Sequence, residues 1–282
     1  MQMPKLDGGA WLAAQGARQL HGPSGPLELT GVRLDSRQVQ PGDLFVALTG
    51  SQTNGWDFVP QAIERGARAI LASQPAPDST AALSVPIWIH PEARRLVGLL
   101  AAERLGHPSR ELEVVAITGT NGKTTTAHML RSLLQAGGES CALLGTTGYH
   151  LAGGQNFAAT HTTPDAPRLQ QLLGLHRQAG GGTVIMEASS HAIDQDRLAG
   201  TEIDLAVFTN LGRDHLDYHG TLEAYAASKA ALFASLGHGG AAVLNADDQE
   251  HPRMAGTAAS AGAQIVTTSL LGPADLWATH VA

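Results

Sequence analysis

The chain has 282 residues, of which 43% are apolar and 15% are charged, with 33 glycines and 14 prolines. This composition excludes a disordered or collagen-like chain, and the length predicts about two globular domains. The net charge of −7 argues against a general nucleic-acid-binding protein, and the single cysteine, Cys141, excludes an intramolecular disulfide and fits a reducing cytoplasm. No apolar run approaches the roughly 20 residues that a membrane span needs.

The first part of the chain predicts a small α/β unit. Short apolar runs bounded by turn residues indicate strands, and apolar positions three and four residues apart indicate helices. The expected strands are 29–34, 44–48, 69–72 and 87–89, and the expected helices are 57–67 and one that begins at Pro91. A Gly-His-Pro-Ser segment at 106–109 ends that last helix, so we expect one domain over residues 1–109 and a second over 110–282.

The second part alternates strands with helices. The expected strands are 114–118, 141–144, 183–187, 205–210, 241–244 and 265–268, and the expected helices are 123–135, 165–178 and 222–236. This alternation predicts a mainly parallel sheet with helices on both faces and a ligand site at the carboxyl ends of the strands. Residues 276–282 predict the beginning of a further strand.

A candidate phosphate-binding loop joins the first strand of the second part to its first helix. Backbone N–H groups and the helix dipole would attract phosphates there, Lys123 would reach the β- and γ-phosphates, and the Thr124 hydroxyl would bind Mg²⁺. The loop is shorter than the full Walker pattern, which needs a glycine where this chain has Ile117, so an ordinary strand-to-helix turn is the alternative. The expected nucleotide-binding residues are Gly119, Thr120, Asn121, Gly122, Lys123, Thr124 and Thr125.

Further candidate residues follow the later strands. Glu187 ends an apolar strand, where a carboxylate beside a nucleotide is a natural partner for Mg²⁺. His215 lies in a densely polar connector after the next strand and could bind a metal or a phosphate. Taken alone, Lys229 in the following helix reads as a surface lysine. Gln195 and Arg197 could clamp an anionic substrate or lie in a solvated helix start.

Four blocks of sequence together resemble the Mur ligases: 119–125, Glu-Ala-Ser-Ser-His at 187–191, Asn-Leu-Gly-Arg-Asp-His-Leu-Asp-Tyr-His-Gly at 210–220, and Asn-Ala-Asp-Asp at 245–248. Leu-Asp-Ser-Arg and Gly-Asp-Leu-Phe-Val-Ala in the first part are similar to the UDP-binding domain of the MurE type. The resemblance covers the chain from about residue 27 to its end. It implies an α/β fold in which a small N-terminal α/β UDP-binding domain precedes a mainly parallel-sheet P-loop-type ATPase domain. That second domain would be truncated, and a C-terminal domain would be absent.

The resemblance also implies roles for individual residues. Lys123, His215 and a carbamylated Lys229 would be catalytic, and Thr124, Glu187, His215 and the carbamylated Lys229 would bind metal. A lysine ammonium would repel Mg²⁺, whereas its carbamate is an anionic oxygen ligand. The residues implied to hold the UDP-muramoyl-peptide are Leu34, Ser36, Ser51, Gln52, Thr53, His161, Thr162, Thr163, Ser189, Gln195 and Arg197.

The activity that the resemblance implies is ATP-dependent amide formation in peptidoglycan precursor synthesis, with ATP and Mg²⁺ as cofactors. The γ-phosphoryl group would pass to the D-Glu carboxylate of UDP-N-acetylmuramoyl-L-alanyl-D-glutamate, and the amine of a diamino acid would attack the acyl phosphate. We expect meso-2,6-diaminopimelate as that amino acid, and a cytoplasmic protein that is monomeric at full length. Two alternatives stay open: a folylpolyglutamate-synthetase-like ligase, whose loop would match, and an inactive nucleotide-binding fragment.

Overall fold

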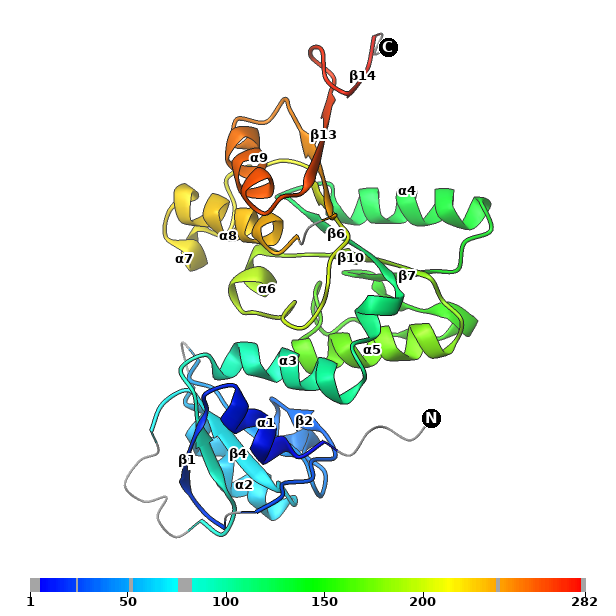
Figure 1. Cartoon of the computed structure of the whole chain (residues 1–282). Coiled ribbons are helices and arrows are strands. Elements are labelled where there is room, and N and C mark those ends of the chain that lie inside the picture. Colours follow the sequence, from blue (N-terminus) through cyan, green and yellow to red (C-terminus); the bar gives the residue numbers. More distant parts are fainter. Residues whose placement is uncertain (1–5, 24, 51–52, 76–82, 237–238, 280–282) are drawn as a thin grey trace. The chain divides into compact units, whose positions relative to one another are not determined.

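The computed structural model describes residues 6–23, 25–50, 53–75, 83–236 and 239–279. The chain divides into two compact units, Met1–Gly106 and His107–Ala282, each built around its own sheet (Figure 1). We call them unit 1 and unit 2 and describe each by itself. None of the helices in the described part of the chain has the length and the apolar content that a membrane crossing needs.

Unit 1 contains a five-stranded sheet in the order β1-β5-β4-β3-β2. The strands are β1 (Arg18–His21), β2 (Val32–Arg33), β3 (Leu44–Ala47), β4 (Ala69–Ala72) and β5 (Ile87–Ile89), and the helices are α1 (Gly8–Ala14), α2 (Val59–Glu64) and α3 (Ala93–Arg104). The four strands β2 to β5 pair in parallel, and β1 pairs antiparallel with β5. The central strands β3 and β4 are buried along their whole length because α1 and α3 pack on one face of the sheet and α2 packs on the other.

The expected elements of unit 1 are confirmed to different degrees. The strands expected at 69–72 and 87–89 have those bounds in the structure. The strand expected at 29–34 is reduced to Val32–Arg33, and the helix expected at 57–67 is a 3₁₀ turn, Gly55–Phe58, followed by the shorter α2. The helix expected to begin at Pro91 begins at Ala93.

Unit 2 contains a nine-stranded sheet in the order β14-β13-β12-β11-β6-β10-β7-β8-β9. The strands are β6 (Glu113–Thr118), β7 (Cys141–Gly145), β8 (Gly148–His150), β9 (Asn156–Phe157), β10 (Thr183–Glu187), β11 (Leu205–Phe208), β12 (Ala241–Asn245), β13 (Gln264–Ser269) and β14 (Leu276–Trp277). The helices are α4 (Lys123–Ala136), α5 (Ala166–Gln178), α6 (Ser190–Asp194), α7 (Leu216–His219), α8 (Leu222–Ala234) and α9 (His251–Ser260). Only the pairs β7–β8 and β8–β9 are antiparallel among these described strands, so the predicted mainly parallel α/β fold is confirmed.

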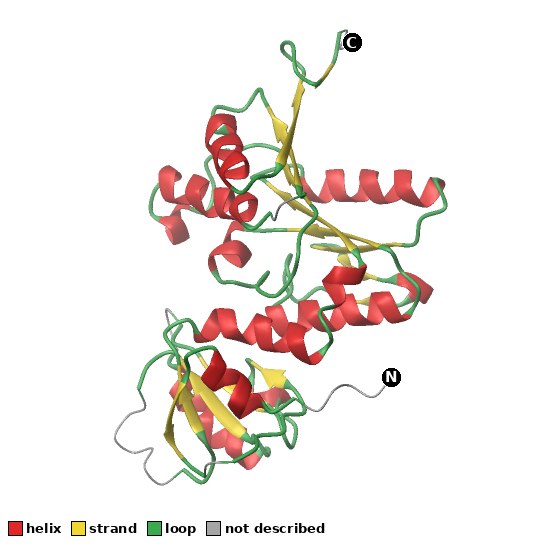
Figure 2. Cartoon of the chain, viewed as in Figure 1, coloured by secondary structure: helices red, strands yellow, loops and turns green. Residues whose placement is uncertain are grey.

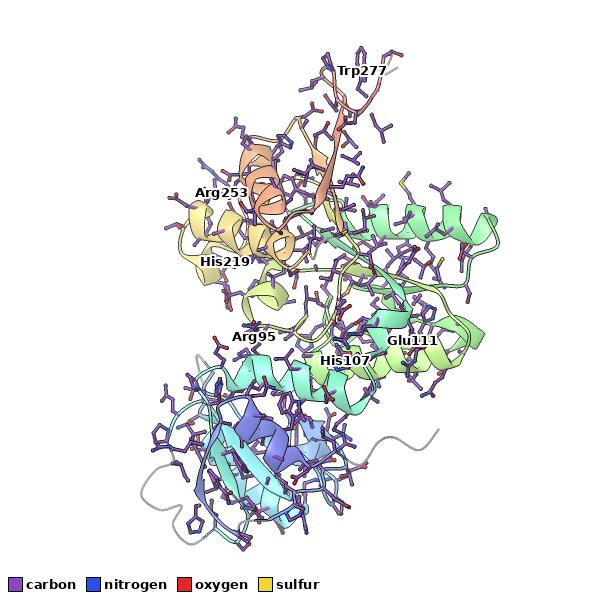
Figure 3. All side chains as sticks on the ribbon, viewed as in Figure 1. Arg95, His107, Glu111, His219, Arg253 and Trp277 are labelled. Carbon is purple, nitrogen blue, oxygen red and sulfur yellow. The ribbon has the colours of Figure 1, made fainter. Side chains whose placement is uncertain are left out.

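The two faces of the unit 2 sheet are covered unequally. Helices α5, α8 and α9 pack on one face, and α4 lies by itself on the other (Figure 2). On the α4 side, Val207 of β11 and Val243 of β12 stay half-buried and line an open cavity of about 650 Å³ together with Trp277. Trp277, near the end of the described chain, belongs to β14, the strand that residues 276–282 were expected to begin (Figure 3). Residues 280–282 lie outside the described part.

The single cysteine lies under α4. Cys141 begins β7 and is buried in the cluster that α4 forms with the sheet, beside Ala127 and Ile185. Burial raises the pKa of its thiol above the ordinary value, and Glu139 adds to this effect. The thiol is therefore protonated and shielded from solvent in the folded chain.

A buried histidine ties three segments of unit 2 together. His176 lies in the last turn of α5, where its Nδ1 accepts a hydrogen bond from the backbone N–H of Ala152 (3.1 Å) and its Nε2 donates to the carbonyl of Thr183 (3.0 Å). This arrangement requires the neutral ring. Burial lowers the pKa of His176 below its ordinary value, and the Thr183 bond opposes the change only in part. A side chain at Gly181 would collide with the ring, so a glycine is needed there.

We expect His176→Gln to change how the stability of unit 2 depends on pH. The folded-state pKa of His176 lies below its unfolded value, so as the pH falls below about 6.5 the unfolded chain binds a proton first and folding weakens. The variant should be less stable at pH 7.5 by about 1–3 kcal/mol, because it leaves a buried group unpaired, and this deficit should shrink at pH 5. Urea unfolding at both pH values measures the two differences. His128→Gln on α4 is the control, and equal deficits at both pH values would contradict this account.

Candidate functional site

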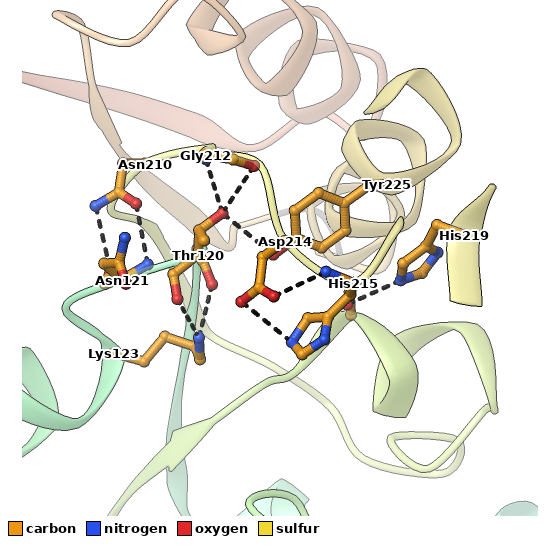
Figure 4. A network of polar contacts seen from close by, with 11 residues as sticks. Thr120, Asn121, Lys123, Asn210, Gly212, Asp214, His215, His219 and Tyr225 are labelled. Atoms are coloured by element: carbon orange, nitrogen blue, oxygen red, sulfur yellow. Dashed lines mark hydrogen bonds and ion pairs between the residues drawn. The ribbon is translucent and has the colours of Figure 1, made fainter. Parts of the chain in front are cut away.

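The phosphate-loop candidate lies at the centre of the unit 2 sheet. Strand β6 runs between β10 and β11, and the loop that follows it leads directly into α4 at Lys123, so the predicted strand–loop–helix order is confirmed. Gly119 and Gly122 have φ values of +148° and +85°, which glycine adopts readily. A side chain at Gly119 would also collide with Thr209. The Lys123 ammonium donates to the carbonyls of Gly119 (2.7 Å) and Thr120 (2.9 Å) (Figure 4).

The strand end next to the loop holds it in place. The backbone N–H of Thr120 donates to the Asn210 carbonyl (2.8 Å), and the N–H of Asn121 donates to the Asn210 side chain (3.0 Å) (Figure 4). The Thr209 hydroxyl donates to the Asn121 carbonyl (2.7 Å), and the N–H of Gly212 donates to the Thr120 hydroxyl (2.8 Å). The loop therefore has a defined shape that depends on the segment after β11.

Glu187 is the buried acid of the site. It is the last residue of β10, and only 1% of its surface is exposed. Its carboxylate accepts hydrogen bonds from the Thr124 hydroxyl (2.8 Å) and from the backbone N–H of Thr146 (2.9 Å). A side chain at Gly145 would collide with this carboxylate. The structure thus brings together Thr124 and Glu187, two of the oxygen ligands predicted for a metal.

Lys229 is buried, although taken alone it reads as a surface lysine. It lies on α8 with 1% of its surface exposed, and its Nζ lies 4.3 Å from the centre of the Tyr225 ring. Burial, aided by the charge of Lys123 and opposed by Asp214, lowers its pKa to about 7. A large part of the population therefore carries a neutral amine at neutral pH, and a neutral amine is a nucleophile.

His215 lies in a cluster of rings beside these groups. It adopts a positive φ of +52°, and its Nε2 lies 3.6 Å from the Asp214 carboxylate (Figure 4). The ring of His191 packs 4.8 Å from that of His215 and 5.5 Å from that of His219. Burial lowers the pKa values of His191 and His219, and repulsion from neighbouring histidines contributes to both shifts.

The sequence analysis missed part of this ring cluster. His191 and His219 lie inside blocks that carry the family resemblance, but only the fold shows that they meet. Tyr225 was also missed, and its hydroxyl lies 3.1 Å from the Thr120 hydroxyl, which links α8 to the phosphate loop. Across the described residues, no group of three or more His, Cys, Asp or Glu side chains is arranged to hold a metal ion. The predicted metal ligands include only two residues of these types, Glu187 and His215, and their metal role is taken up below as a proposal.

Several predicted substrate residues meet behind Glu187. The Thr163 hydroxyl donates to the Glu187 carbonyl (2.8 Å) and accepts from the backbone N–H of Ser189 (3.1 Å). The Arg197 guanidinium donates to the Thr163 carbonyl (3.0 Å) and to the Gln195 side chain (2.8 Å). Thr163, Ser189, Gln195 and Arg197 therefore form one connected group, and a guanidinium there can recognise an anion.

Two further predicted residues lie at the edge of this group. The Thr162 hydroxyl lies 3.2 Å from the Thr146 hydroxyl, which also donates to the Glu187 carboxylate (3.4 Å). The backbone carbonyl of His161 accepts a hydrogen bond from the buried Tyr149 hydroxyl (2.7 Å). Burial lowers the pKa of the His161 ring, and the nearby charge of Arg197 lowers it further. The ring is therefore kept neutral at neutral pH.

The predicted UDP-binding residues lie in unit 1. Leu34 and Ser36 follow β2, and Thr53 lies in the loop after β3, so all three belong to segments that leave the carboxyl ends of neighbouring parallel strands. Ser51 and Gln52, from the same loop, lie outside the described residues. The structure thus places the predicted residues in two groups, one in each unit.

Comparison with known protein families gives two matches. The model of the Mur ligase middle domain matches residues 117–282, and that of the Mur ligase family catalytic domain matches residues 28–104.

Curated relatives of this chain are named UDP-N-acetylmuramoyl-L-alanyl-D-glutamate–2,6-diaminopimelate ligase, and two of them show the extent of the match. That of Synechococcus elongatus is 44% identical over 263 residues, which are 90% of this chain and 51% of the relative. That of Chromobacterium violaceum is 47% identical over 225 residues, which are 79% of this chain and 45% of the relative. The chain therefore spans about half the length of the curated relatives that it matches.

Solved structures of Mur ligases also resemble this chain. A structure of a UDP-N-acetylmuramoyl-L-alanyl-D-glutamate–2,6-diaminopimelate ligase matches with a TM-score of 0.77 and 35% identity, over 92% of this chain and 52% of the other. MurF from Acinetobacter baumannii matches with a TM-score of 0.64 at 20% identity, over 100% of this chain and 57% of that one, a likeness of fold alone. The match to the Mur ligase middle domain covers more than half of this chain, so the chain belongs to the Mur ligase family.

Proposed function

We propose that the chain is part of an ATP-dependent ligase that joins a diamino acid, 2,6-diaminopimelate, to UDP-N-acetylmuramoyl-L-alanyl-D-glutamate. One observation carries the proposal: the Thr124–Glu187 hydrogen bond lies at the carboxyl ends of adjacent parallel strands. It lies beside the loop whose Gly119 carbonyl accepts a hydrogen bond from the Lys123 ammonium. Phosphate-binding groups and a buried acid at that position are what a phosphoryl-transfer site needs. The names of the relatives supply the substrates.

The chemistry starts from a carboxylate, which is a poor electrophile because it has no leaving group. Transfer of the γ-phosphoryl group of ATP to the D-Glu carboxylate makes an acyl phosphate. The amine of the diamino acid then attacks the acyl carbon, a C–N bond forms, the C–O bond to phosphate breaks, and the amine loses a proton. Lys123 and the loop N–H groups neutralise phosphate charge and hold the groups in line, so positioning and electrostatics supply the catalysis.

The residues around Glu187 fit a divalent metal, and we propose Mg²⁺. A hydroxyl oxygen and a buried carboxylate, 2.8 Å apart, are hard oxygen ligands of the kind that this ion prefers. Thr124 and Glu187 would hold the ion, with His215 as a further ligand. When bound, the ion would neutralise negative charge on the phosphates.

Lys229 joins this set as a carbamate. Its neutral amine nitrogen would attack the carbon of CO₂ and release a proton to water, which converts a buried base into an anionic oxygen ligand. The lowered pKa of about 7 supports this step, because only the unprotonated amine reacts. As an ammonium, the same side chain would repel both the metal and Lys123.

The two groups of predicted substrate residues divide the substrate between them. In unit 2, Thr162, Thr163, Ser189, Gln195 and Arg197 would hold the muramoyl-peptide, together with His161. In unit 1, Leu34, Ser36 and the 51–53 segment would hold the UDP part. We further propose that the whole protein works in the cytoplasm as a monomer.

Reaction and binding measurements test the proposal. Isothermal titration of the chain with UDP-N-acetylmuramoyl-L-alanyl-D-glutamate should show binding, and absence of binding would contradict the assignment. Release of ADP on addition of 2,6-diaminopimelate would establish ligase activity of this chain. Binding of both substrates without ADP release would favour the second candidate, a nucleotide-binding portion that needs the remaining half of its relatives' length for catalysis.

We expect Lys123→Ala to weaken ATP binding about 10- to 100-fold, because a charged hydrogen-bond donor to the phosphates is removed. Binding of the UDP-linked substrate should change less than twofold. Isothermal titration with each ligand in turn measures both effects. Gln135→Ala, on the exposed part of α4, is the matched control. Equal loss of both ligands would contradict the role given to Lys123.

We expect ¹³C-labelled bicarbonate to produce one carbamate signal by nuclear magnetic resonance at pH 7 to 8, because the Lys229 amine is neutral enough to react there. Acidification should remove the signal as the amine is protonated and CO₂ is released. The chain has three lysines, Lys5, Lys123 and Lys229, so assignment needs few variants. The signal should disappear in Lys229→Ala and survive in Lys123→Arg. A signal that persists without Lys229 would contradict the assignment.

A further inference from the structure

A tyrosine of the short helix α7 contacts the end of α6, next to the predicted substrate residues Gln195 and Arg197, which we call the clamp. Tyr218 is 42% exposed, yet its hydroxyl donates to the Asp194 carboxylate (2.6 Å) and accepts from the Gln195 side-chain amide (3.3 Å). The ring of His191, in the first turn of α6, packs 4.1 Å from the tyrosine ring. These contacts hold an otherwise exposed side chain against α6.

The chemistry of the partners fixes the direction of each hydrogen bond in this network. A guanidinium can only donate, so the Arg197 N–H group that lies 2.8 Å from the Gln195 amide bonds the amide oxygen. The amide N–H₂ group then faces Tyr218, whose oxygen accepts, and the tyrosine proton goes to the Asp194 carboxylate, which can only accept. The bonds therefore run one way, from the guanidinium at one end to the carboxylate at the other.

This one-way order holds the Gln195 amide in a single orientation. An unconstrained glutamine amide can exchange the positions of its oxygen and its nitrogen, because both orientations fill nearly the same space. In the exchanged orientation the amide N–H₂ group would face the Arg197 guanidinium, donor against donor. The amide oxygen would then face Tyr218, whose proton is already held by Asp194. Asp194 therefore selects, through Tyr218, the orientation in which the Gln195 oxygen holds Arg197.

The clamp is fixed at a second point. The Arg197 guanidinium also donates to the Thr163 carbonyl (3.0 Å), so the network and the segment before α5 hold the same group. A side chain that is ordered before its ligand arrives loses less conformational entropy on binding. A residue that keeps the clamp ordered should therefore raise the affinity for an anionic ligand, although it acts only through Gln195.

We propose that Tyr218 is a positioning residue that, together with Asp194, orients the Gln195–Arg197 clamp for the anionic peptide part of the substrate. The inference rests on the proposed function, which gives the peptide part to unit 2 and the UDP part to unit 1. The tyrosine hydroxyl should therefore affect the affinity for the UDP-linked peptide, and it should leave the affinities for uridine diphosphate and for ATP unchanged.

The test is isothermal titration of the 282-residue chain with UDP-N-acetylmuramoyl-L-alanyl-D-glutamate and, separately, with uridine diphosphate and with ATP. Tyr218→Phe keeps the ring and removes only the hydroxyl, so it should weaken binding of the UDP-linked peptide about three- to tenfold, the effect of one lost hydrogen bond. The affinities for uridine diphosphate and ATP should stay within about twofold. Ser260→Ala, which removes an exposed hydroxyl bonded to Gly256 on α9, is the matched control.

Two changes at Asp194 test the direction of the network. Asp194→Asn keeps an oxygen that accepts the tyrosine proton, so affinity for the UDP-linked peptide should stay within about twofold. Asp194→Leu removes that acceptor, the tyrosine proton turns toward the Gln195 amide, and affinity should fall as in Tyr218→Phe. The double variant of Tyr218→Phe with Asp194→Leu should bind no more weakly than either single variant, because both changes act through the same amide.

The outcomes separate this inference from the proposed function. If the unaltered chain binds the UDP-linked peptide and Tyr218→Phe binds it equally well, the inference is overturned and the proposed function stands. An equal loss of uridine diphosphate or ATP binding would also overturn the inference, as would additive losses in the double variant. If the unaltered chain does not bind the UDP-linked peptide, the proposed function and the inference both fail. Circular dichroism verifies that each variant is folded, and the comparison of Asp194→Leu with Asp194→Asn carries the test if Tyr218→Phe is not.

Discussion

The buried carboxylate of Glu187 is the constraint on which the site in unit 2 depends. A carboxylate removed from water is stable only if hydrogen-bond donors replace the water, so the chain must bring donors to the end of β10. They come from the first turn of α4, through Thr124, and from the turn after β7, through Thr146. The backbone carbonyl of the same residue receives the Thr163 hydroxyl from the segment before α5. Three separate connections therefore converge on one strand end, and the phosphate loop is held beside them.

Lys229 has the opposite character, because its burial works against its charge. The ring of Tyr225 covers its amine, and the positive charge of Lys123 repels it, so the site contains an amine that is only partly protonated at neutral pH. The hydroxyl of the same tyrosine contacts Thr120 in the loop. Helix α8 therefore joins the amine to the phosphate-binding segment through a single aromatic side chain. A packing change at Tyr225 would therefore alter the surroundings of the Lys229 amine and the position of the phosphate loop.

The sequence predicts the fold best where apolar runs are long and buried. Strands β4, β5 and β10 have the expected bounds, because fully buried parallel strands consist of continuous apolar residues. Helix α1 was missed because it opens with two glycines and depends on the Asp7 cap, and β1 was missed because it is a polar edge strand. At the site, strand-end reasoning brings Glu187 to Thr124, whereas a role for Lys229 was expected only from the resemblance and its burial is known only from the structure, because a lysine in a helix carries no local signal of its surroundings. Contacts between distant segments, such as those of Tyr225 and of the histidine rings, are properties of the tertiary packing and have no spacing in the sequence that reveals them.

The single cysteine lies where its reaction rate reports the separation of α4 from the sheet. Cys141 is shielded by α4 and by its neighbouring strands, and the raised pKa of its thiol slows reaction further. A thiol reagent can modify it only when α4 separates from the sheet or when unit 2 unfolds. Because no second thiol competes, the modification rate in the native protein measures the free energy of that opening directly. Helix α4 begins at the phosphate loop, so a ligand that orders the loop would slow the modification of Cys141. The native cysteine serves for this measurement, and no engineered residue is needed.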